Sequence, residues 1–548
     1  MSDIVTVATV IGSVLRAQGV GTVFGVVGSG NYLPTAALKS VGARFVPARH
    51  ESAAVSMADA LWRTTGEIAA ASVHQGPGLS NTVTALGEAV KSRVPLVVIS
   101  GATSASTRRS NFLIDQQALV ESVGAGYETI RSPETAVEDV AAVLQRAKDE
   151  RRPIVLAVPI DVQETMVEFD SSLIPPLRDR PRVVPPAAAL ASIAAQLSRA
   201  ERPVILAGRG ALLSGAEAVL ADLAEILDAK LCTSAMAHGL FTGNDRLLGI
   251  CGGFSADATV AQVHAADVVL VVGASLTTWT TRAGTLFDNK PTVIQVDSEL
   301  PGLHASAYAD VAVLGDARET VAALLELLPT QRREGAGLSQ SEQRNLAADA
   351  PAYATAAGRP LHPGEVTARL ETLLPRERTL VVDGGHFIGW PVRGLSIPDS
   401  AGFVFSSAGF QSIGLGMGSA VGAAIGRPDR TVVLASGDGG FLMGISELET
   451  IVRLNLPIVI VIYNDGAYGA EVHHFGADDP HVDLVRFADT DIGALTSGSG
   501  ARVVTVHTLD ELDVIKDWDG HRDGPLLLDV VIDPTIVGEW AAQDFVGH

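Results

Sequence analysis

Short runs of β-branched and aliphatic residues recur along this chain, and each is followed by glycine or another small residue and then by a helical stretch. In the first part of the chain these runs lie at residues 22–28, 68–74, 95–101 and 153–159. A strand, a helix and a second strand in this order form the βαβ unit, which places parallel strands in one sheet. The alternation therefore predicts an α/β fold built from doubly wound parallel sheets.

The alternation is interrupted twice, and each time it restarts. A proline-rich stretch at residues 175–186 and a polar, alanine-rich stretch at residues 329–362 have the composition of interdomain linkers. Strand-like runs resume after each stretch, at 203–210, 267–275, 291–298, 378–386, 430–440, 457–467, 501–508 and 525–533. Because a chain of 548 residues is also too long for one core, we predict three α/β domains, over residues 1–175, 187–330 and 360–548.

The charge of the chain limits its partners. The formal net charge is −22 and no cluster of Lys or Arg is present, which disfavours nucleic acid, because a polyanion is bound through clustered cations. An anionic cofactor would have to be held locally by a metal ion, by backbone N–H groups or by helix N-termini.

Cysteine content and terminal sequence indicate a reducing compartment. The only cysteines are Cys232 and Cys251, too few for a disulfide framework. The first residues lack a basic start and a small-residue cleavage site, so we expect a cytoplasmic protein. The longest uncharged run, residues 406–426, contains Gln411 and lacks flanking anchors, which favours a buried segment over a membrane span.

The most specific segment of the sequence runs from Gly437 to Glu471. An apolar run brings Asp438 to the carboxyl edge of a sheet, and the next apolar run brings Asp465 to the same edge, so the two aspartates should end neighbouring parallel strands. The glycines that would let backbone approach a ligand closely there are Gly437, Gly439 and Gly440. Two oxygen donors at such an edge suit a hard cation that bridges to a diphosphate. A Gly-Asp-Gly turn by itself is also compatible with a purely structural role.

A second candidate residue lies in the first domain. Glu51 begins an alanine-rich helical stretch, and a carboxyl group buried against such residues tends to keep its proton. The alternative is that Glu51 only stabilises the N-terminus of its helix.

Together these motifs resemble those of a known enzyme family. Gly-Asp-Gly at residues 437–439, ELETIVR at 447–453 and NDGAYG at 464–469, with RHESAA at 49–54 and HQGPGLSN at 74–81, are similar to the thiamine diphosphate motifs of the acetolactate synthase and 2-oxo acid decarboxylase family. The resemblance implies aminopyrimidine-binding, central and diphosphate-binding domains and a cofactor held with Mg²⁺. It implies metal ligation by Asp438, Asp465 and the carbonyl oxygen of Ala467. Most members carry Asn where this chain has Asp465.

The same resemblance implies how the cofactor is held. Glu51 would hydrogen-bond the aminopyrimidine ring and favour the tautomer that removes the thiazolium proton. Ile413 would bend the cofactor, and the carbonyl of Gln411 would accept from the ring. The diphosphate end would lie against Gly385, His386, Gly437, Gly439, Gly440, Tyr468 and Gly469. Four glycines spaced every four residues, Gly414, Gly418, Gly422 and Gly426, predict a bare helical stripe for close packing.

Residues near the expected reaction centre show a mixed pattern. Ser29 and His74 resemble the benzoylformate decarboxylase branch, in which the histidine is catalytic, and Glu471 falls where pyruvate decarboxylases carry a catalytic glutamate. Residues 76–101, in contrast, resemble acetolactate synthases. In the central domain, residues 271–282 lack the GARFDDR-like run of the FAD-containing synthases, so FAD is not expected.

Four further residues have open roles. His473 and His474 follow Glu471 on one helical turn, where a pair of histidines is more often simply solvated. Gln117 matches a substrate-contacting glutamine of the synthases, and Asn111 is the rival for that position.

We therefore predict an enzyme dependent on thiamine diphosphate and Mg²⁺ that makes or breaks a carbon–carbon bond beside a carbonyl. The leading expectation is a 2-oxo acid decarboxylase or carboligase. The alternatives are a lyase of 2-hydroxy ketones or a hydrolase of cyclic diones, which share the carbanion chemistry, and a non-catalytic cofactor-binding regulatory protein. The family places the cofactor between the first domain of one subunit and the third of another, which implies a homodimer or homotetramer.

Overall fold

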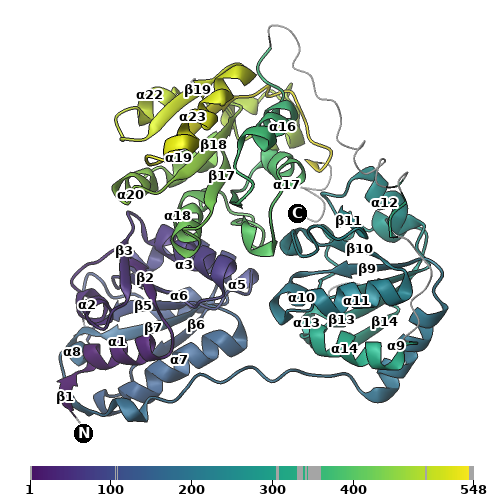
Figure 1. Ribbon diagram of the computed structural model, residues 1–548. Helices are drawn as coiled ribbons and strands as arrows, with labels where there is room; N and C mark the ends of the chain where they lie inside the picture. The colour runs from purple at the N-terminus through teal and green to yellow at the C-terminus, as the bar shows by residue number, and fades with distance from the viewer. Residues whose placement is uncertain are drawn as a thin grey trace. The chain divides into compact units, whose positions relative to one another are not determined.

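Three six-stranded sheets with helices around them make up this molecule (Figure 1). The computed structural model describes residues 3–104, 106–107, 109–303, 308–329, 337–339, 342, 359–487 and 490–541. Parallel pairing runs through all three sheets, which confirms the predicted fold class. Most of the polar stretch at 329–362 lies outside the described residues.

The chain divides into two compact units. The first unit joins residues 1–180 with 358–388 and 404–534, so it contains the first and third sheets. The second unit joins residues 181–357 with 389–403 and 535–548 and contains the central sheet.

The first sheet lies between two layers of helices. Its strands, in spatial order, are β3 (Arg44–Pro47), β2 (Thr22–Gly25), β4 (Ala70–Val73), β5 (Val97–Ala102), β7 (Ile154–Pro159) and β6 (Gly126–Thr129). The accompanying helices are α1 (Val7–Ala17), α2 (Tyr32–Ser40), α3 (Glu51–Thr65), α4 (Pro77–Ser80), α5 (Val83–Lys91), α6 (Gln116–Glu121), α7 (Ala136–Glu150) and α8 (Ile160–Gln163). Helices α1 and α7 share one apolar cluster and α3 and α5 another, so β5 and β7 are covered on both faces and are apolar along almost their whole length. A separate antiparallel ribbon pairs β1 (Asp3–Thr6) with β8 (Met166–Phe169).

The third sheet has the strand order β16 (Phe403–Phe405), β15 (Arg378–Val382), β17 (Thr431–Gly437), β18 (Ile458–Asn464), β20 (Leu526–Val531) and β19 (Arg502–Val506). Its helices are α16 (Pro363–Leu373), α18 (Gly416–Gly426), α19 (Asp438–Gly444), α20 (Glu447–Arg453), α21 (Gly469–Phe475), α22 (Ile492–Thr496) and α23 (Val514–His521). Because β17 and β18 are neighbours, the residues that follow them emerge at the same edge.

The central sheet follows the same plan. Its strands, in order, are β11 (Leu247–Ile250), β10 (Lys230–Thr233), β9 (Pro203–Ala207), β12 (Val268–Val272), β13 (Thr292–Asp297) and β14 (Val311–Leu314). Its unit also holds α9 (Ala187–Arg199), α10 (Arg209–Ser214), α11 (Glu217–Leu227), α12 (Asp257–His264), α13 (Leu300–Leu303), α14 (Ala317–Leu327) and α17 (Gly389–Gly394).

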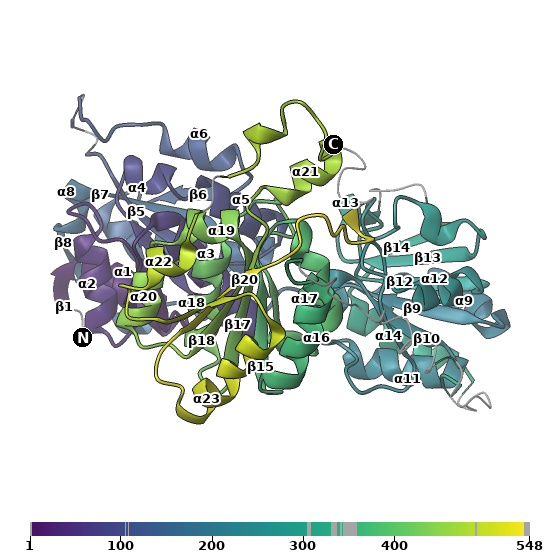
Figure 2. The ribbon, with the colours of Figure 1, turned by 90° about the horizontal axis from the view of Figure 1, so that it is seen from above.

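Helices α3 and α18 pack closely side by side within the first unit (Figures 1 and 2). A Cβ atom added at Gly418 would lie 3.0 Å from the Cα of Ala53, and one at Gly422 would overlap the carbonyl of Met57. The glycine stripe therefore brings the two backbones together. The prediction was wrong for Gly414, which precedes α18 and has a φ of 87°, so it serves a turn and not the helix face.

One apolar cluster runs through this contact and includes Val55 of α3, Val421 of α18 and Leu434 of β17. The first and third sheets thus share a core. Among the described residues, no helix has both the length and the apolar character that crossing a bilayer requires.

Candidate active site

Two aspartates lie side by side at the carboxyl edge of the third sheet. Strand β17 ends at Gly437 in register with Tyr463 of β18. Asp438, which is 5% exposed, begins α19, and Asp465 follows directly after β18. The structure therefore brings together the two carboxylates that the sequence places at neighbouring strand ends.

These carboxylates lie in an environment that disfavours their negative charge. Burial raises the pKa of Asp438 to about 6, and the charge of Asp529 acts in the same direction. Burial and the charge of Asp438 raise the pKa of Asp465 to about 7. Within the described part of the chain, Oδ2 of Asp465 is buried and accepts no hydrogen bond. A cation at this position would relieve both effects.

The oxygen atoms at this edge fit a hard divalent ion that takes its remaining ligands from phosphate oxygens or water. In the ranges that the structure describes, no three His, Cys, Asp or Glu side chains are arranged to hold a metal. Two carboxylates, a backbone carbonyl and phosphate oxygens are typical of Mg²⁺ sites. Ala467, whose carbonyl is the predicted third ligand, is tied to the same loop, because its N–H donates to Asp465 Oδ1 at 3.3 Å. Asn464 is instead engaged with Asp529, to which its amide donates at 2.8 Å.

Glycine is sterically required at several places around this edge. A Cβ atom at Gly469 would overlap both Asp465 Oδ2 and the ring of His386. A Cβ at Gly439 would lie 2.7 Å from the ring of Tyr468, and one at Gly440 would lie 2.9 Å from Oδ2 of Asp383. Backbone thus approaches the site more closely than any side chain would allow. Gly437 is less constrained, because its nearest neighbour, Phe387, would be 3.5 Å away.

His386 lies at the same edge. It follows Gly385, whose φ is 138°, and its Nε2 is 3.6 Å from Oδ2 of Asp465. Its ring meets that of His473 edge to face at 4.7 Å. Burial, with a smaller effect of His473, lowers the pKa of His386 to about 3, so the imidazole is neutral near pH 7.

Asp383 is a site residue that sequence reasoning missed. It follows β15, is 1% exposed, and accepts from the N–H groups of Gly384 at 2.8 Å and Gly414 at 3.1 Å and from Ser436 Oγ at 3.3 Å. It therefore ties the end of β15 to the turn that leads into α18. Its position directly after an apolar run, as for Asp438, was the available signal.

Asp383 provides a pH test of this arrangement. Burial raises its pKa to about 6 from a usual value of 3.8. A carboxyl whose pKa rises on folding stabilises the native state fully below its unfolded pKa, and this contribution is lost as pH rises through the folded pKa. The wild type should lose about 3 kcal/mol of its free energy of unfolding from this group between pH 4 and pH 7, and Asp383→Asn should not. Denaturant titrations of both proteins at each pH measure the difference in free energy of unfolding. A difference that does not change with pH would contradict the assignment.

The segment that the cofactor's ring end was predicted to contact precedes α18. Gln411 adopts a left-handed backbone with a φ of 54°, which is uncommon for a residue with a side chain. A Cβ at Gly384 would lie 2.9 Å from Cγ2 of Ile413, so Ile413 packs against the turn after Asp383.

Glu51 and His74 both lie beside Gly78. A Cβ at Gly78 would lie 3.4 Å from Oε1 of Glu51 and 3.1 Å from Cβ of His74. Glu51 begins α3 and its Oε2 accepts from Asn81 Nδ2 at 2.9 Å. Its side chain is only partly buried, less than the alanine-rich sequence suggested, because it stands at the open end of the helix.

His74 is oriented by its neighbours. Its Nδ1 lies 2.8 Å from the carbonyl oxygen of Gln75, so Nδ1 carries a proton and donates it. In the neutral ring Nε2 is then an acceptor, and it lies 3.4 Å from Oγ of Ser29. The ring packs against Phe112 at 4.7 Å. The structure therefore groups Ser29 and His74 with Glu51.

The remaining predicted residues are more scattered. Glu471 lies in the first turn of α21 and is partly buried, His473 is partly buried, and His474 is exposed. Gln117 donates to Glu121 at 2.9 Å on an exposed face. The neighbouring Gln116 is the buried one, and it donates to Ser100 Oγ at 2.9 Å. Asn111 is exposed.

Three family models match the chain in order. They are the N-terminal TPP binding domain of thiamine pyrophosphate enzymes over residues 5–120, their central domain over 190–324 and their C-terminal TPP binding domain over 383–530. The chain belongs to the thiamine pyrophosphate enzyme family. This confirms the resemblance drawn from the motifs.

Curated relatives of this thiamine pyrophosphate enzyme cover nearly its whole length. It is 30% identical to a probable 2-ketoarginine decarboxylase of Pseudomonas aeruginosa, over 91% of this chain and 89% of the relative. It is 27% identical to a probable acetolactate synthase large subunit of Methanocaldococcus jannaschii, over 95% and 91%. Among solved structures, the 4-hydroxybenzoylformate decarboxylase of Rhodococcus jostii aligns with a TM-score of 0.81 and 22% identity, over 96% of this chain and 99% of that one. The last comparison shows that the fold is shared.

Proposed function

We propose that this thiamine pyrophosphate enzyme binds thiamine diphosphate with Mg²⁺ and acts as a 2-oxo acid decarboxylase or carboligase. The observation that carries the proposal is the buried pair Asp438 and Asp465, whose negative charges burial disfavours and of which Asp465 Oδ2 accepts no hydrogen bond from the described residues. With the carbonyl of Ala467 they would hold the metal, and the glycines of this edge together with His386 would border the diphosphate.

The chain's own groups account for the proton transfers that such a reaction needs. When bound, the cofactor supplies a thiazolium ring that acts as an electron sink for a carbonyl substrate. Glu51 would exchange a proton with the aminopyrimidine ring, which Gln411 and Ile413 would orient. The Nε2 atom of His74, with the Ser29 hydroxyl beside it, would give or take a proton at the substrate. Glu471 is a further proton donor or acceptor within the predicted set.

The pairing of His74 with Ser29 favours 2-oxo acids as substrates. Two proteins similar to this chain are named for 2-oxo acid substrates. They are the probable 2-ketoarginine decarboxylase and the 4-hydroxybenzoylformate decarboxylase. The experiment is calorimetry with thiamine diphosphate and Mg²⁺, followed by product analysis with pyruvate, benzoylformate, 2-ketoarginine and, as a 2-hydroxy ketone, benzoin. Absence of cofactor uptake would overturn the proposal, and cleavage of benzoin alone would favour the lyase alternative.

Replacing His74 by alanine tests its proposed role. We expect kcat for the accepted 2-oxo acid to fall about 10²- to 10⁴-fold, as for loss of a general acid or base, while the Kd of thiamine diphosphate stays unchanged. The matched control is His474→Ala, because His474 is exposed. An unchanged kcat in the His74 variant would remove this residue from the reaction.

For the assembled protein we propose a cytoplasmic homodimer or homotetramer acting on a small molecule. The family resemblance supports the assembly. The presence of only two cysteines, Cys232 and Cys251, supports the cytoplasmic location. The contact of α3 with α18 within one unit is compatible with either state, and light scattering of the purified protein tests the assembly.

A further inference from the structure

Two buried glutamates outside the predicted set connect the first-sheet and third-sheet parts of the first unit. They are Glu88 of α5, which is 2% exposed, and Glu447 of α20, which is 1% exposed. Each uses its carboxylate to accept backbone N–H groups from the other part of the unit. A carboxylate removed from water to this degree must be well compensated, and the bonds below provide that compensation.

Glu447 holds the backbone immediately before Glu51. Its Oε1 accepts from the N–H groups of Arg49 and His50, both at 2.9 Å, and its Oε2 accepts from Thr450 Oγ1 at 2.7 Å. Hydrogen bonds from backbone N–H groups to a carboxylate are short and about twice as strong as neutral ones. The entry to α3, and with it the position of Glu51, is therefore fixed from α20.

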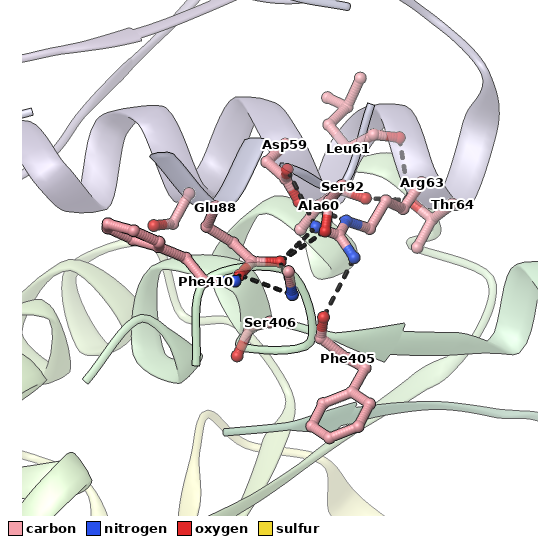
Figure 3. A network of polar contacts seen from close by, with 12 residues as sticks. Asp59, Ala60, Leu61, Arg63, Thr64, Glu88, Ser92, Phe405, Ser406 and Phe410 are labelled. Carbon is pink, nitrogen blue, oxygen red and sulfur yellow. Dashed lines mark hydrogen bonds and ion pairs between the residues drawn. The ribbon is translucent and has the colours of Figure 1, made fainter. Parts of the chain in front are cut away.

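Glu88 holds the backbone immediately before Gln411 (Figure 3). Its Oε2 accepts from the N–H groups of Phe410 at 2.7 Å and Gly409 at 3.0 Å, and its Oε1 accepts from Ser92 Oγ at 2.6 Å. Since Gln411 has a left-handed backbone, which is strained for a residue with a side chain, the surrounding structure has to fix its conformation.

A buried arginine balances the charge beside Glu88 (Figure 3). Arg63 lies 3.2 Å from Glu88 Oε1 and 2.5 Å from Asp59 Oδ1, and it donates to the carbonyl oxygen of Phe405 at 3.0 Å. Arg63 thus ties a second point of the 405–410 segment to α3.

We propose that Glu88 and Glu447 are positioning residues for the groups predicted to contact the aminopyrimidine ring, each acting through the backbone that precedes one of those groups. Glu447 places Glu51, and Glu88 places Gln411 and the segment leading to Ile413. The inference rests on the proposed binding of thiamine diphosphate. It follows that loss of the Glu447 carboxylate misplaces Glu51, and loss of the Glu88 carboxylate misplaces the residues that orient the ring, while the metal and diphosphate edge stays intact.

The experiment measures cofactor activation separately from cofactor binding. For the holoenzyme, exchange of the thiazolium ring proton with D₂O is followed by acid quench and NMR, and the Kd of thiamine diphosphate with Mg²⁺ is measured by calorimetry. We expect Glu447→Gln and Glu88→Gln to slow exchange about 10- to 100-fold, since a shift of about 1 Å in a reacting group has effects of this size, with little change in Kd.

The control is Glu449→Gln. Glu449 lies on the same helix and pairs with the Arg49 side chain at 2.5 Å, but both side chains are about half exposed, so its loss should leave exchange unchanged. Two milder variants keep the test valid if a Glu→Gln variant does not fold. Thr450→Val removes one hydrogen bond to Glu447, and Ser92→Ala removes one hydrogen bond to Glu88. They should slow exchange severalfold.

The outcomes separate the two proposals. Wild-type protein that takes up no thiamine diphosphate would overturn the proposed function. Wild-type binding with normal exchange in the folded Glu88 and Glu447 variants would overturn the positioning role alone. The positioning role would also be overturned if Glu449→Gln slowed exchange equally. The same holds if the Glu88 and Glu447 variants lost cofactor affinity and thermal stability in parallel with exchange, because a general weakening of the first unit would then explain the effect.

Discussion

Replacing Glu51 with glutamine is expected to lower turnover about 10²- to 10⁴-fold, the range for removal of a general acid or base, while thiamine diphosphate still binds. Glu51 is the first residue of α3 and is partly buried, and its Oε2 accepts a hydrogen bond from Asn81 Nδ2 at 2.9 Å. Glutamine keeps the size and the hydrogen bond to the neighbouring amide but cannot exchange a proton. Steady-state kinetics with an accepted 2-oxo acid and calorimetry with the cofactor measure the two quantities separately.

The control for this variant is Glu67→Gln, since Glu67 is exposed just beyond the end of the same helix. Its kcat should equal that of wild type. Undiminished turnover in the Glu51 variant would show that the mechanism is wrong, whereas loss of cofactor binding in that variant would assign Glu51 a role in affinity.

The fold could be predicted because short stretches of sequence indicate where each strand and each helix lies. Each strand is a short apolar run ended by a small residue, and the parallel sheets with helices on both faces follow from that repeating pattern. The meeting of Asp438 and Asp465 was predictable for the same reason, as the two residues end consecutive strands that pair directly.

Contacts between distant segments could not be predicted. Glu447 bonds to backbone 398 positions away, and Glu88 to backbone 322 positions away. Glu447 begins the motif ELETIVR, but neither local sequence shows which distant backbone groups these glutamates bind. Asp383 is an intermediate case, because its strand-end position was visible but its partner Gly414 was not.

Periodicity also misled at the end of an element. Gly414 continues the spacing of the glycine stripe but lies before α18 with a φ of 87°, because a turn has to bring the chain from Gln411 into the helix. Spacing alone does not show where a helix begins.

Replacing Asp438 with alanine is expected to weaken Mg²⁺-dependent binding of thiamine diphosphate about 100-fold or more, because loss of even an outer group of a metal site costs 10- to 100-fold. Asp465→Asn should have a much smaller effect. The amide oxygen still serves a hard cation, and the substitution removes the negative charge that burial and Asp438 disfavour, which together raise the pKa of Asp465 to about 7. Calorimetric titration of thiamine diphosphate at fixed Mg²⁺ gives both values.

The contrast between these two variants tests the site more sharply than either alone. Two facing carboxylates without a metal repel each other, so Asp465→Asn should raise the thermal unfolding temperature of the metal-free protein and reduce the increase that Mg²⁺ with cofactor produces. Asp478→Ala, an exposed aspartate in the segment after α21, should change neither. If Asp438→Ala bound the cofactor like wild type, the two strand-end aspartates would not be metal ligands, and their raised pKa values would reflect only burial and neighbouring carboxylates.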